Sequence, residues 1–434
     1  MSREMSRRML VKAGGAALGW TAVRSGRVLG ANERVRLGFI GVGNRGEQLL
    51  QAFRPHADAE VAGLCDVYVP YLDRANKLLG AKAATCRDFR KLLDRSDLDA
   101  VVVATPDHWH AIQTIAACRA GKDVYVEKPL SITVREGRRM VEVARQTGRV
   151  VQVGIHMRAS TLYGQLAGLI AAGKIGKITV SRVYRLSNMA PSGIGRVRPS
   201  QAPADLDWDL WLGPRPARPF QENIAPYKFR WWHLYSSQVA NWGVHFLDLI
   251  RWLTGETAPA SVCAMGGRFG VDDDRTIPDT MEVTFEFASG RLAIFGQYEA
   301  SGNPALPRGD VELRGTLGTA YLFYFGSPRY QLVPERGGQF QDPKPRIEPA
   351  EAASRDGDLT VRHARDFLDC IKSRTLPQAD VEVGHRSTTM SLLANISLAT
   401  RKRLEWDAQR EQFTDCPEAN ALLHYEYRSP WKLE

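Results

Sequence analysis

Short apolar runs alternate with amphipathic stretches between residues 34 and 157. The runs have the length and composition of buried strands and lie at 35–40, 60–65, 100–104, 123–126 and 150–154. The intervening stretches carry apolar residues at helical spacing and lie at about 46–53, 70–79, 110–120 and 134–146. Strands that alternate with helices of this length require right-handed crossovers and a parallel sheet. The pattern predicts an α/β fold with an N-terminal Rossmann domain over residues 34–157.

A different pattern follows in residues 158–434. Apolar and polar residues alternate over 281–287, and a turn at 289–290 leads into a further strand, which together predict a half-buried antiparallel hairpin. Two more candidate strands lie at 311–314 and 319–324. Residues 328–357 are rich in Pro, Gly, Gln and charge, so we expect an extended arm without a core of its own.

Composition narrows the class of protein. The chain has 434 residues, enough for two or three packed units, and its 44% apolar and 24% charged residues are typical of globular rather than fibrous or multi-span membrane proteins. About half of the net charge of +10 lies in residues 1–31, and no basic block follows, which argues against a nucleic-acid partner. The six cysteines show no CxxC spacing, which argues against a zinc ribbon or a disulfide scaffold.

Residues 1–31 resemble a twin-arginine export signal. Arg7 and Arg8 precede Lys12 and an apolar stretch at 13–23, which is shorter than the roughly twenty residues that span a bilayer. The signal predicts a periplasmic or exported protein with no other membrane association; the alternative is a basic, unstructured N-terminus. Because this route carries folded proteins, it suits an enzyme that binds its cofactor before export.

A glycine-rich turn follows the first strand, with the sequence Gly41, Val42, Gly43, Asn44, Arg45 and Gly46. The first glycine permits a tight turn, the second lets the backbone approach a pyrophosphate, and the third lets the helix pack on the strand. Asp66 ends the second strand twenty residues after Gly46, where its carboxylate can accept hydrogen bonds from ribose hydroxyls. This spacing predicts NAD as the cofactor. NADP is the alternative if Arg74 or Arg45 relieves the repulsion between Asp66 and a 2′-phosphate.

Four motifs in this order resemble those of the Gfo/Idh/MocA family of nicotinamide-dependent oxidoreductases. They lie at 41–46, 105–110 (Thr-Pro-Asp-His-Trp-His), 127–129 (Glu-Lys-Pro) and 241–248 (Asn-Trp-Gly-Val-His-Phe-Leu-Asp). The resemblance runs from about residue 35 to the C-terminus. It implies an α+β second domain, 158–434, built on a large, mostly antiparallel sheet, with the substrate held between the domains. It also implies a homo-oligomer formed through the free face of that sheet.

The candidate catalytic residues are Lys128, His245 and Asn241. Oxidation of an alcohol needs a base near the hydroxyl, for which His245 is suited, and a cation that steadies the developing alkoxide. In the resembling family, the lysine that matches Lys128 contacts the reacting hydroxyl. Asn241 shares a helical face with His245 at a position where relatives often carry Asp; because an amide cannot take a proton, we expect it to orient the imidazole or bind a hydroxyl. The alternative is that His245 is a core histidine satisfied by Asp248.

Further site residues are expected at the carboxyl ends of the parallel strands and in the second domain. The predicted cofactor-binding residues there are Thr105, Pro106, His108, His110, Glu127 and Lys128. The predicted substrate-binding residues are Arg158, Tyr163, Arg230, Trp232 and Asp248, since aromatic faces and fixed donors suit sugar rings. His108 and His110 have no third ligand nearby in the sequence, so no metal site is predicted.

Three functions remain open at this point. The leading hypothesis is hydride transfer between NAD(H) and a hydroxyl carbon of a sugar, glycoside or polyol, which outside the cytoplasm requires a tightly held cofactor. The second is redox-neutral cleavage or isomerisation of a glycoside through transient oxidation, as some members of the wider family perform. The third is a non-catalytic sugar or nucleotide sensor, which the amide at Asn241 encourages.

Overall fold

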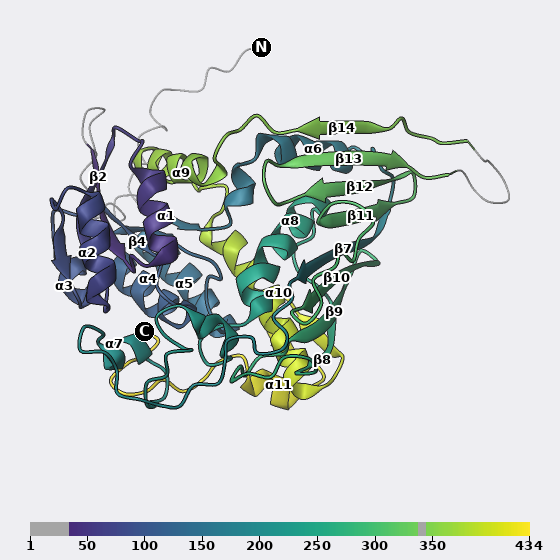
Figure 1. Cartoon of the computed structure of the whole chain (residues 1–434). Helices are drawn as coiled ribbons and strands as arrows, with labels where there is room; N and C mark the ends of the chain where they lie inside the picture. Colours follow the sequence, from purple (N-terminus) through teal and green to yellow (C-terminus); the bar gives the residue numbers. More distant parts are fainter. Residues whose placement is uncertain (1–33, 337–343) are drawn as a thin grey trace, which may run out of the picture. The chain divides into compact units, whose positions relative to one another are not determined.

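The computed structural model describes residues 34–336 and 344–434, and the predicted export signal at 1–31 lies outside the described residues. Residues Arg34–Glu434 form one compact unit that contains a parallel sheet of six strands and a mostly antiparallel sheet of ten. Figure 1 shows the two sheets with helices packed against each. The predicted fold class, a Rossmann sheet followed by a large antiparallel sheet, is confirmed.

The parallel sheet contains six strands in the order β3-β2-β1-β4-β5-β6, and every neighbouring pair is parallel. Its strands are β1 (Val35–Ile40), β2 (Ala59–Cys65), β3 (Ala84–Cys86), β4 (Ala100–Val103), β5 (Asp123–Val126) and β6 (Val151–Val153). The order reverses between β1 and β4. Ligands bind at such a switch point, beyond the carboxyl ends of the strands.

The helices of this region follow the strands along the chain. They are α1 (Asn44–Phe53), α2 (Val69–Leu78), α3 (Phe89–Leu93), α4 (His110–Arg119) and α5 (Val134–Thr147), with a 3-10 turn, η1, at Asp107–Trp109. The predicted strands and helices match these bounds to within two residues, whereas β3 and α3 were not predicted. A capping box between Thr133 and Glu136 fixes the start of α5, and Gly148 ends it with φ 64°.

The large sheet has the order β14-β13-β12-β11-β7-β10-β9-β8-β15-β16, with β7 and β10 as its parallel pair. Its strands are β7 (Ile178–Leu186), β8 (Ser261–Gly267), β9 (Thr280–Phe287), β10 (Arg291–Tyr298), β11 (Val311–Gly315), β12 (Gly318–Phe323), β13 (Arg329–Pro334), β14 (Ala350–Ala353), β15 (Leu404–Asp407) and β16 (Gln412–Phe413). The prediction of an arm over 328–357 was wrong at β13 and β14. Tyr330 and Leu332 are buried beside β12, so this segment joins the sheet and its core.

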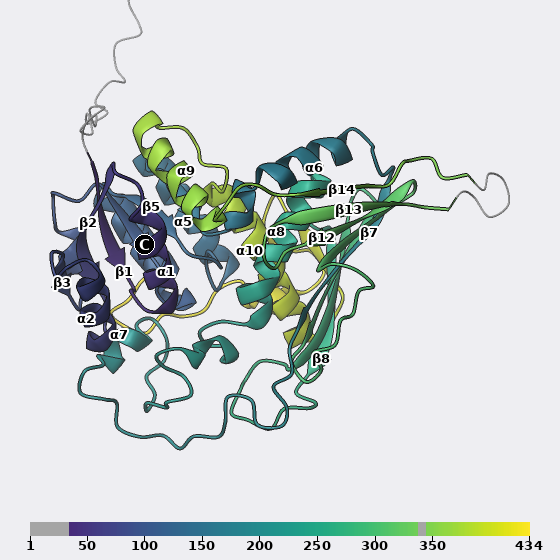
Figure 2. The same cartoon turned by 45° about the horizontal axis from the view of Figure 1, so that its top comes forward.

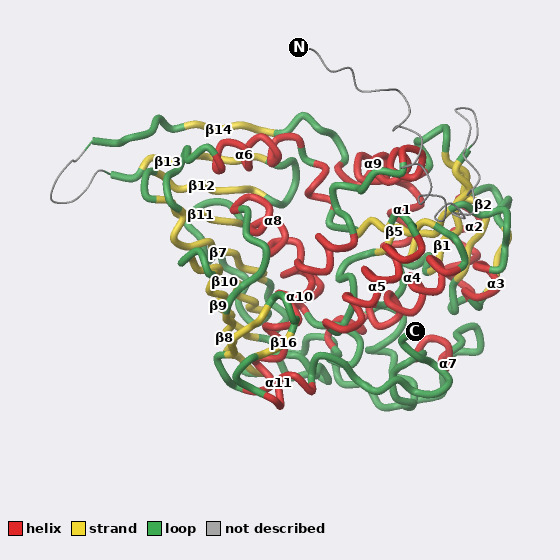
Figure 3. Tube along the Cα trace, turned by 180° about the vertical axis from the view of Figure 1, so that it is seen from behind, coloured by secondary structure: helices red, strands yellow, loops and turns green. Residues whose placement is uncertain are grey.

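The helices of the second domain are α6 (Thr161–Ala171), α7 (Trp208–Leu212), α8 (Val244–Thr254), α9 (Leu359–Ser373), α10 (Val381–Thr400) and α11 (Pro417–Ala421). Residues of α6, α8, α10 and α11 share a core with the large sheet, whereas α9 packs against α1 and α7 lies beside the parallel sheet. Shorter turns are η2 (His156–Ala159), η3 (Lys228–Trp231) and η4 (Val239–Gly243), of which η4 is a π-helix. Figure 1 and the view from behind in Figure 3 show α8 and α10 along the sheet. None of the described helices combines the length and apolar character needed to cross a membrane.

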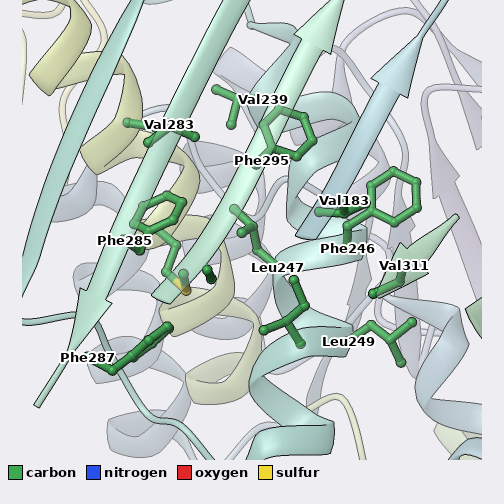
Figure 4. Packing of buried hydrophobic residues seen from close by; sticks show 14 of the residues in the cluster. Val183, Val239, Phe246, Leu247, Leu249, Val283, Phe285, Phe287, Phe295 and Val311 are labelled. Atoms are coloured by element: carbon green, nitrogen blue, oxygen red, sulfur yellow. The ribbon is translucent and has the colours of Figure 1, made fainter. Parts of the chain in front are cut away.

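The core of the second domain forms between α8 and the inner face of the sheet. Val283, Phe285 and Phe287 alternate inward from β9, as the sequence pattern predicts, and are each at most 2% exposed. Figure 4 shows these side chains with Phe295 of β10 on the sheet side and Leu247 of α8 opposite. Burial of each large apolar side chain contributes about 1.5–3 kcal/mol relative to exposure. This packing fixes α8, and with it the 241–248 motif, against the sheet.

Two segments from the second half of the chain reach the parallel sheet. The strap, defined as residues 202–232, pairs with the connection between β2 and α2 through a bridge between Tyr68 and Leu206. The C-terminal tail, defined as residues 424–434, places the Trp431 ring 4.7 Å from that of Trp109. Tail and strap are joined because Arg428 Nε donates to the Gly213 carbonyl at 2.9 Å. Figure 2 shows the strap running from α7 with little regular structure.

Candidate active site

A glycine cradle lies where β1 turns into α1. Gly41 has φ 85°, and a Cβ at this position would lie 2.7 Å from the backbone of Ala104. A Cβ on Gly46 would lie 2.2 Å from the Gly41 carbonyl oxygen, so only glycine lets the helix approach the turn this closely. No side chain caps the first turn of α1 after Gly43. Its free backbone N–H groups therefore form an anion-binding end.

Asp66 closes the other side of this cradle. Its Oδ2 accepts a hydrogen bond from Val42 N at 2.8 Å, and its Oδ1 accepts one from Tyr68 N at 3.0 Å. Burial raises the pKa of Asp66 to about 6, against the opposing effect of these hydrogen bonds. The carboxylate is therefore fixed at the carboxyl end of β2, with lone pairs left to accept hydrogen bonds from a ligand.

A groove of about 850 Å³ runs over the cradle. The parallel-sheet region contributes Gly41, Gly43, Asn44, Arg45, Asp66, Phe89, Thr105, Pro106 and Trp109 to its lining. The strap contributes Leu210, Trp211, Pro226, Tyr227, Phe229 and Arg230. The groove is thus closed by residues from both halves of the chain, and Trp431 of the C-terminal tail supports Trp109 from behind.

Two of the predicted cofactor-binding residues are corrected by the structure. His108 Nε2 lies 2.9 Å from the Trp211 carbonyl oxygen, and His110 lies 2.7 Å from that of Pro129 and 2.9 Å from that of Thr105. Both rings are 1% exposed, and neither lines the groove. Burial lowers the pKa of His108 to about 3, so its ring is neutral. The two histidines hold the 105–110 loop and the strap in place.

Val42 and Gly46 also support the cradle without lining the groove. Both are buried; Val42 acts through its N–H to Asp66, and Gly46 through the close approach of α1. Thr105 lines the groove, and its Oγ1 donates to Gln113 Oε1 at 2.7 Å. The predicted site thus divides into residues that face the groove and residues that shape it from beneath.

Buried Glu127, after the end of β5, forms an ion pair with the partly exposed Arg45. Arg45 Nε donates to Glu127 Oε1 at 2.7 Å, and Glu127 Oε2 accepts from Lys128 N at 3.1 Å. Burial acts to raise the pKa of Glu127, but Arg45 and Lys128 outweigh it and keep the carboxyl below its ordinary value. Glu127 is therefore ionised and engaged with the protein's own cation.

A second cavity, of about 1200 Å³, adjoins the groove and is named here the substrate-side cavity. The two share Asn44, Arg45, Ala104, Thr105, Tyr227 and Arg230 in their linings. The substrate-side cavity is further lined by Gln48, Asp107, Glu127, Lys128, Arg185, Ser187, Met189, Trp231, Gln238, Asn241, Trp242 and Glu299. Because six residues line both, the groove and the cavity meet around Thr105.

Lys128 is held in the wall of the substrate-side cavity by Asn241. Its Nζ donates to the Asn241 carbonyl oxygen at 2.7 Å and to Oδ1 at 2.8 Å. An ammonium has three donors, so one N–H remains for a ligand. Burial lowers the pKa of Lys128 to about 8, partly offset by the charge of Glu127. The amine therefore titrates close to neutral pH.

Asn241 is held in turn by a chain of buried polar groups. Asn241 Nδ2 donates to Gln238 Oε1 at 3.2 Å, and Gln238 Nε2 donates to Glu299 Oε1 at 2.9 Å. The chain ends at Arg275, which donates to Glu299 Oε2 at 2.7 Å. Asn241 lies in η4, and single π-turns of this kind are frequent at functional sites. A guanidinium buried at 0% exposure thus fixes the orientation of the Lys128 acceptor.

His245 lies behind the cavity wall rather than in its lining. Its ring centroid is 5.4 Å from that of His156 and 5.9 Å from that of Tyr324, and the side chain is 7% exposed. Its Nδ1 has no hydrogen-bond partner among the residues that the structure describes. Burial, followed by the charge of Lys128, lowers the pKa of His245 well below its ordinary value. The imidazole is therefore neutral and has an unused nitrogen.

Four of the five predicted substrate-binding residues are structural. Arg158 and Asp248 form a bidentate ion pair, with Nε–Oδ2 and Nη2–Oδ1 distances of 2.9 Å, so Asp248 does not serve His245. Tyr163 is 0% exposed, and its hydroxyl donates to the Phe323 carbonyl. Trp232 donates to the Asn223 carbonyl inside the strap. These four side chains serve contacts within the protein, and Arg230 is the one predicted substrate-binding residue that lines the cavity.

Arg185, Gln238 and Glu299 line the substrate-side cavity but were not predicted from the sequence. Arg185 lies at the end of β7, and Glu299 directly follows β10. In the sequence, each is only a charged residue at the end of a strand. That pattern does not reveal that the ends of β7 and β10 lie side by side. In residues 34–336 and 344–434, no group of three or more His, Cys, Asp or Glu side chains is placed to hold a metal ion.

Three family models match successive parts of the chain. The model described as "Oxidoreductase family, NAD-binding Rossmann fold" matches residues 35–155. The "GFO/IDH/MocA C-terminal domain" matches residues 163–321, and the "Oxidoreductase family, C-terminal alpha/beta domain" matches residues 339–433. Together they account for most of the chain, in the order in which the two sheets occur.

Curated relatives match a shorter stretch. "Glycosyl hydrolase family 109 protein 1" of Shewanella sp. strain ANA-3 is 31% identical over 158 residues, which is 34% of this chain and 34% of that protein. "Alpha-N-acetylgalactosaminidase" of Shewanella oneidensis is 32% identical over the same length and the same shares. The match thus spans about a third of the length of these relatives.

Solved structures share the fold over most of the chain. Levoglucosan dehydrogenase in complex with NADH and levoglucosan has a TM-score of 0.65 at 18% identity, covering 86% of this chain and 99% of that one. Aldose-aldose oxidoreductase from Caulobacter crescentus gives 0.64 at 16% identity, with 86% and 100% covered. The WlbA dehydrogenase from Bordetella pertussis gives 0.64 at 20% identity, with 86% and 99% covered. At these identities the likeness establishes the fold.

Proposed function

The chain belongs to the GFO/IDH/MocA oxidoreductase family, and from that membership we propose that it transfers a hydride between NAD and a hydroxyl carbon of a sugar, glycoside or polyol. The observation that carries the proposal is the junction of the two cavities. A glycine-cradled groove meets a polar cavity that contains the Lys128 amine, and six residues line both. A redox cofactor in the groove and a hydroxyl compound in the cavity would meet there.

The residues of the groove fit NAD. The glycine cradle offers free N–H groups to a pyrophosphate, and Asp66 keeps lone pairs for ribose hydroxyls. NADP is disfavoured because both arginines that might relieve a 2′-phosphate are engaged: Arg45 with Glu127, and Arg74 with Glu47 at 2.6 Å. When bound, NAD supplies a nicotinamide ring that accepts or returns a hydride.

The side chains around the junction stabilise the reacting oxygen, hold the ammonium and accept the hydroxyl proton. The third N–H of the Lys128 ammonium donates to the reacting oxygen and steadies its negative charge, while Asn241 holds the ammonium in position. We assign the hydroxyl proton to the neutral imidazole of His245; because the ring lies behind the cavity wall and its Nδ1 is buried, this role requires the ring to reach the substrate when the site is occupied. Asn241 takes no proton, because an amide is not a base at neutral pH.

A second candidate function is redox-neutral cleavage of a glycoside. Curated relatives at 31–32% identity carry the names of a glycosyl hydrolase family and of an α-N-acetylgalactosaminidase. In this chemistry a hydroxyl is oxidised to a ketone, the adjacent C–H is deprotonated, and the aglycone is eliminated as an alcohol. Water then adds to the resulting double bond, and the hydride returns to the ketone. The strap favours such a cycle, because a groove closed from both halves of the chain retains its cofactor between steps.

One pair of measurements tests both candidates. Mass spectrometry of the small molecules released on denaturation identifies the cofactor and shows whether it is retained through purification; the expected species is NAD. Incubation of the holoprotein with aryl glycosides and their parent sugars then separates the reactions. Formation of NADH with an intact sugar supports net oxidation, whereas aglycone release at constant NAD content supports redox-neutral cleavage. If no sugar gives either NADH or a released aglycone, both candidate functions are contradicted and a sugar sensor is favoured.

The outer face of the large sheet supports a proposal about assembly. Met265 is 76% exposed and Phe269 73% exposed, beside a cavity that extends over β8, β9 and β10. Exposed apolar side chains on a sheet face are typical of an interaction surface. We propose a homo-oligomer formed through this face. Light scattering on the wild type and on Met265→Lys is the test, and an unchanged molar mass contradicts the proposal.

The location of the protein is a separate proposal. The paired arginines and apolar stretch of residues 1–31 support export by the twin-arginine route. Fusion of this segment to a reporter, with Arg7→Lys and Arg8→Lys as the paired control, is the test. Equal export of both fusions would contradict the proposal.

A further inference from the structure

Two guanidinium groups line the substrate-side cavity without a carboxylate partner. They belong to Arg185 at the end of β7 and to Arg230 in the strap. Among the described residues, no Asp or Glu oxygen lies within 4.0 Å of either group. Arg275 provides the contrast, since it contacts both Asp273, at 2.9 Å, and Glu299, at 2.7 Å. Arg185 and Arg230 thus present donor groups that the protein itself leaves largely unused.

Arg185 is held in place chiefly by an aromatic ring. Its guanidinium carbon lies 4.2 Å from the centroid of the Trp242 ring. Its recorded hydrogen bond, from Nη1 to the Leu186 carbonyl, is long at 3.5 Å. Stacking of this kind orients the planar fork while leaving its edge free for a bidentate contact.

The acids that share the cavity are already engaged. Glu127 accepts from Arg45, and Asp107 accepts from the Ser236 hydroxyl. Glu299 accepts from Arg275, from Gln238 and from the Trp231 indole, at 3.1 Å. Glu299 attracts Arg185 through its charge, but its oxygens accept from these three groups and not from Arg185. No acid of the cavity therefore forms a direct ion pair with Arg185.

We propose that the substrate carries an oxyanion substituent, a carboxylate or a phosphate ester, and that Arg185 binds it. The inference rests on the proposed function and names the substrate class: a sugar acid or a sugar phosphate. Trp242 follows Asn241 directly in η4, and Asn241 holds Lys128. The anionic substituent and the reacting hydroxyl therefore bind along one short wall. A fork-shaped cation matches the two oxygens of a carboxylate or phosphate better than it matches a single hydroxyl.

Arg230 has a different position, because it lines both the groove and the substrate-side cavity. It can therefore contact the cofactor as well as the substrate. Arg185 lines the substrate-side cavity alone, so the two arginines can be separated by measuring cofactor and sugar binding in parallel. Arg185→Gln is expected to leave NAD affinity unchanged, whereas Arg230→Gln is expected to weaken it.

The test compares matched ligands on the holoprotein: glucose, glucuronate and glucose 6-phosphate, then galactose and galacturonate. Binding is read from quenching of the cavity tryptophans, and turnover from NADH absorbance. At least one anionic ligand is expected to bind about tenfold or more tightly than its neutral parent, a preference that weakens as salt is added. Preference for a uronate identifies a carboxylate as the bound group, and preference for glucose 6-phosphate identifies a phosphate.

Variants then assign the preference to its residue. Arg185→Gln is expected to remove the preference, Arg185→Lys to restore part of it, and Arg54→Gln, at the exposed end of α1, to leave it unchanged. Turnover of neutral sugars with no preference for anionic ones overturns this inference and leaves the proposed function standing. Selective binding of an anionic ligand that Arg185→Gln removes, without turnover of any sugar, supports the inference and overturns the proposed function.

Discussion

The groove and the substrate-side cavity meet at Thr105 but are built in different ways. The groove uses backbone: a positive φ at Gly41, close contacts at Gly46 and free N–H groups at the start of α1. The cavity uses side chains from distant elements: Lys128 after β5, Asn241 in η4 and Glu299 after β10. A backbone site can be formed by a short stretch of sequence, whereas a side-chain site needs the whole fold. Changes to one should therefore leave the other intact, which gives four tests.

The largest effect is expected from Lys128→Met. Loss of the ammonium at the reacting oxygen should lower kcat about a thousandfold while leaving the NAD content of the purified protein unchanged. Steady-state kinetics and cofactor mass spectrometry on the same sample provide the measurement. Lys91→Met, on the exposed surface of α3, is the matched control and should retain wild-type turnover. Unchanged turnover in Lys128→Met would favour a sugar sensor over an enzyme.

Gly41→Ala should have the opposite effect to Lys128→Met, because it should weaken NAD binding and spare the substrate-side cavity. A Cβ at φ 85° meets the Ala104 backbone at 2.7 Å, so the cradle must distort. We expect NAD affinity to fall about tenfold to a hundredfold, from strain of about 1–3 kcal/mol, and sugar binding to persist. Gly80→Ala has a similar positive φ, 68°, with nothing within 4 Å of the added Cβ, so it controls for strain alone. Equal loss of NAD in both variants would show that the close approach at Gly41 is unimportant.

The pH dependence separates the two proton-handling groups. Burial lowers the pKa of Lys128 to about 8, so its charged form is present below pH 8 and is lost above it. If the ammonium steadies the alkoxide and His245 is the base, kcat/KM for oxidation should fall about tenfold per pH unit above pH 8. Lys128→Arg keeps its charge and should remove this fall. A rate that instead rises through pH 8 would make Lys128 the base.

The smallest effect is expected from Trp431→Ala in the C-terminal tail. Its ring supports Trp109, which lines the groove, so its loss should loosen one wall without touching the cradle. We expect NAD to dissociate about fivefold faster, from a loss of roughly 1 kcal/mol of packing, with kcat unchanged. Stopped-flow fluorescence provides the measurement, and the exposed neighbour Lys432→Ala is the control. An unchanged dissociation rate would show that the tail does not support the groove.

The same contrast explains what could be predicted from the sequence. Five of the six strands of the parallel sheet and the glycine turn follow local rules, so their predicted bounds lie within two residues of the structure; β3, which has only three residues, was not predicted. The prediction of Asp248 as a substrate ligand was wrong because Asp248 pairs with Arg158. The two lie ninety positions apart, and no local pattern reveals that pairing. The prediction missed β13 for a similar reason. Its Tyr330 and Leu332 are buried against β12, although the composition of the segment is typical of a loop.

Arg185 and Glu299 show which part of the site could not be predicted from the sequence. Each is a charged residue at a strand end, a common feature of exposed loops. Their meaning depends on which other charges lie nearby, and that emerges only when β7 and β10 pair in parallel. His108 and His110 show the reverse error, since polar residues in a motif can serve carbonyl groups of the protein rather than a ligand.

The strap and the C-terminal tail have a consequence for how the protein is made. When a ribosome has translated residue 157, all six strands of the parallel sheet have been made, yet the walls at 210–230 and the support at Trp431 have not. Loading of the nucleotide is therefore expected to be completed only after the strap and residues 424–434 have been made. A stop codon just before residue 424 would then weaken cofactor retention, even though every catalytic side chain has been translated.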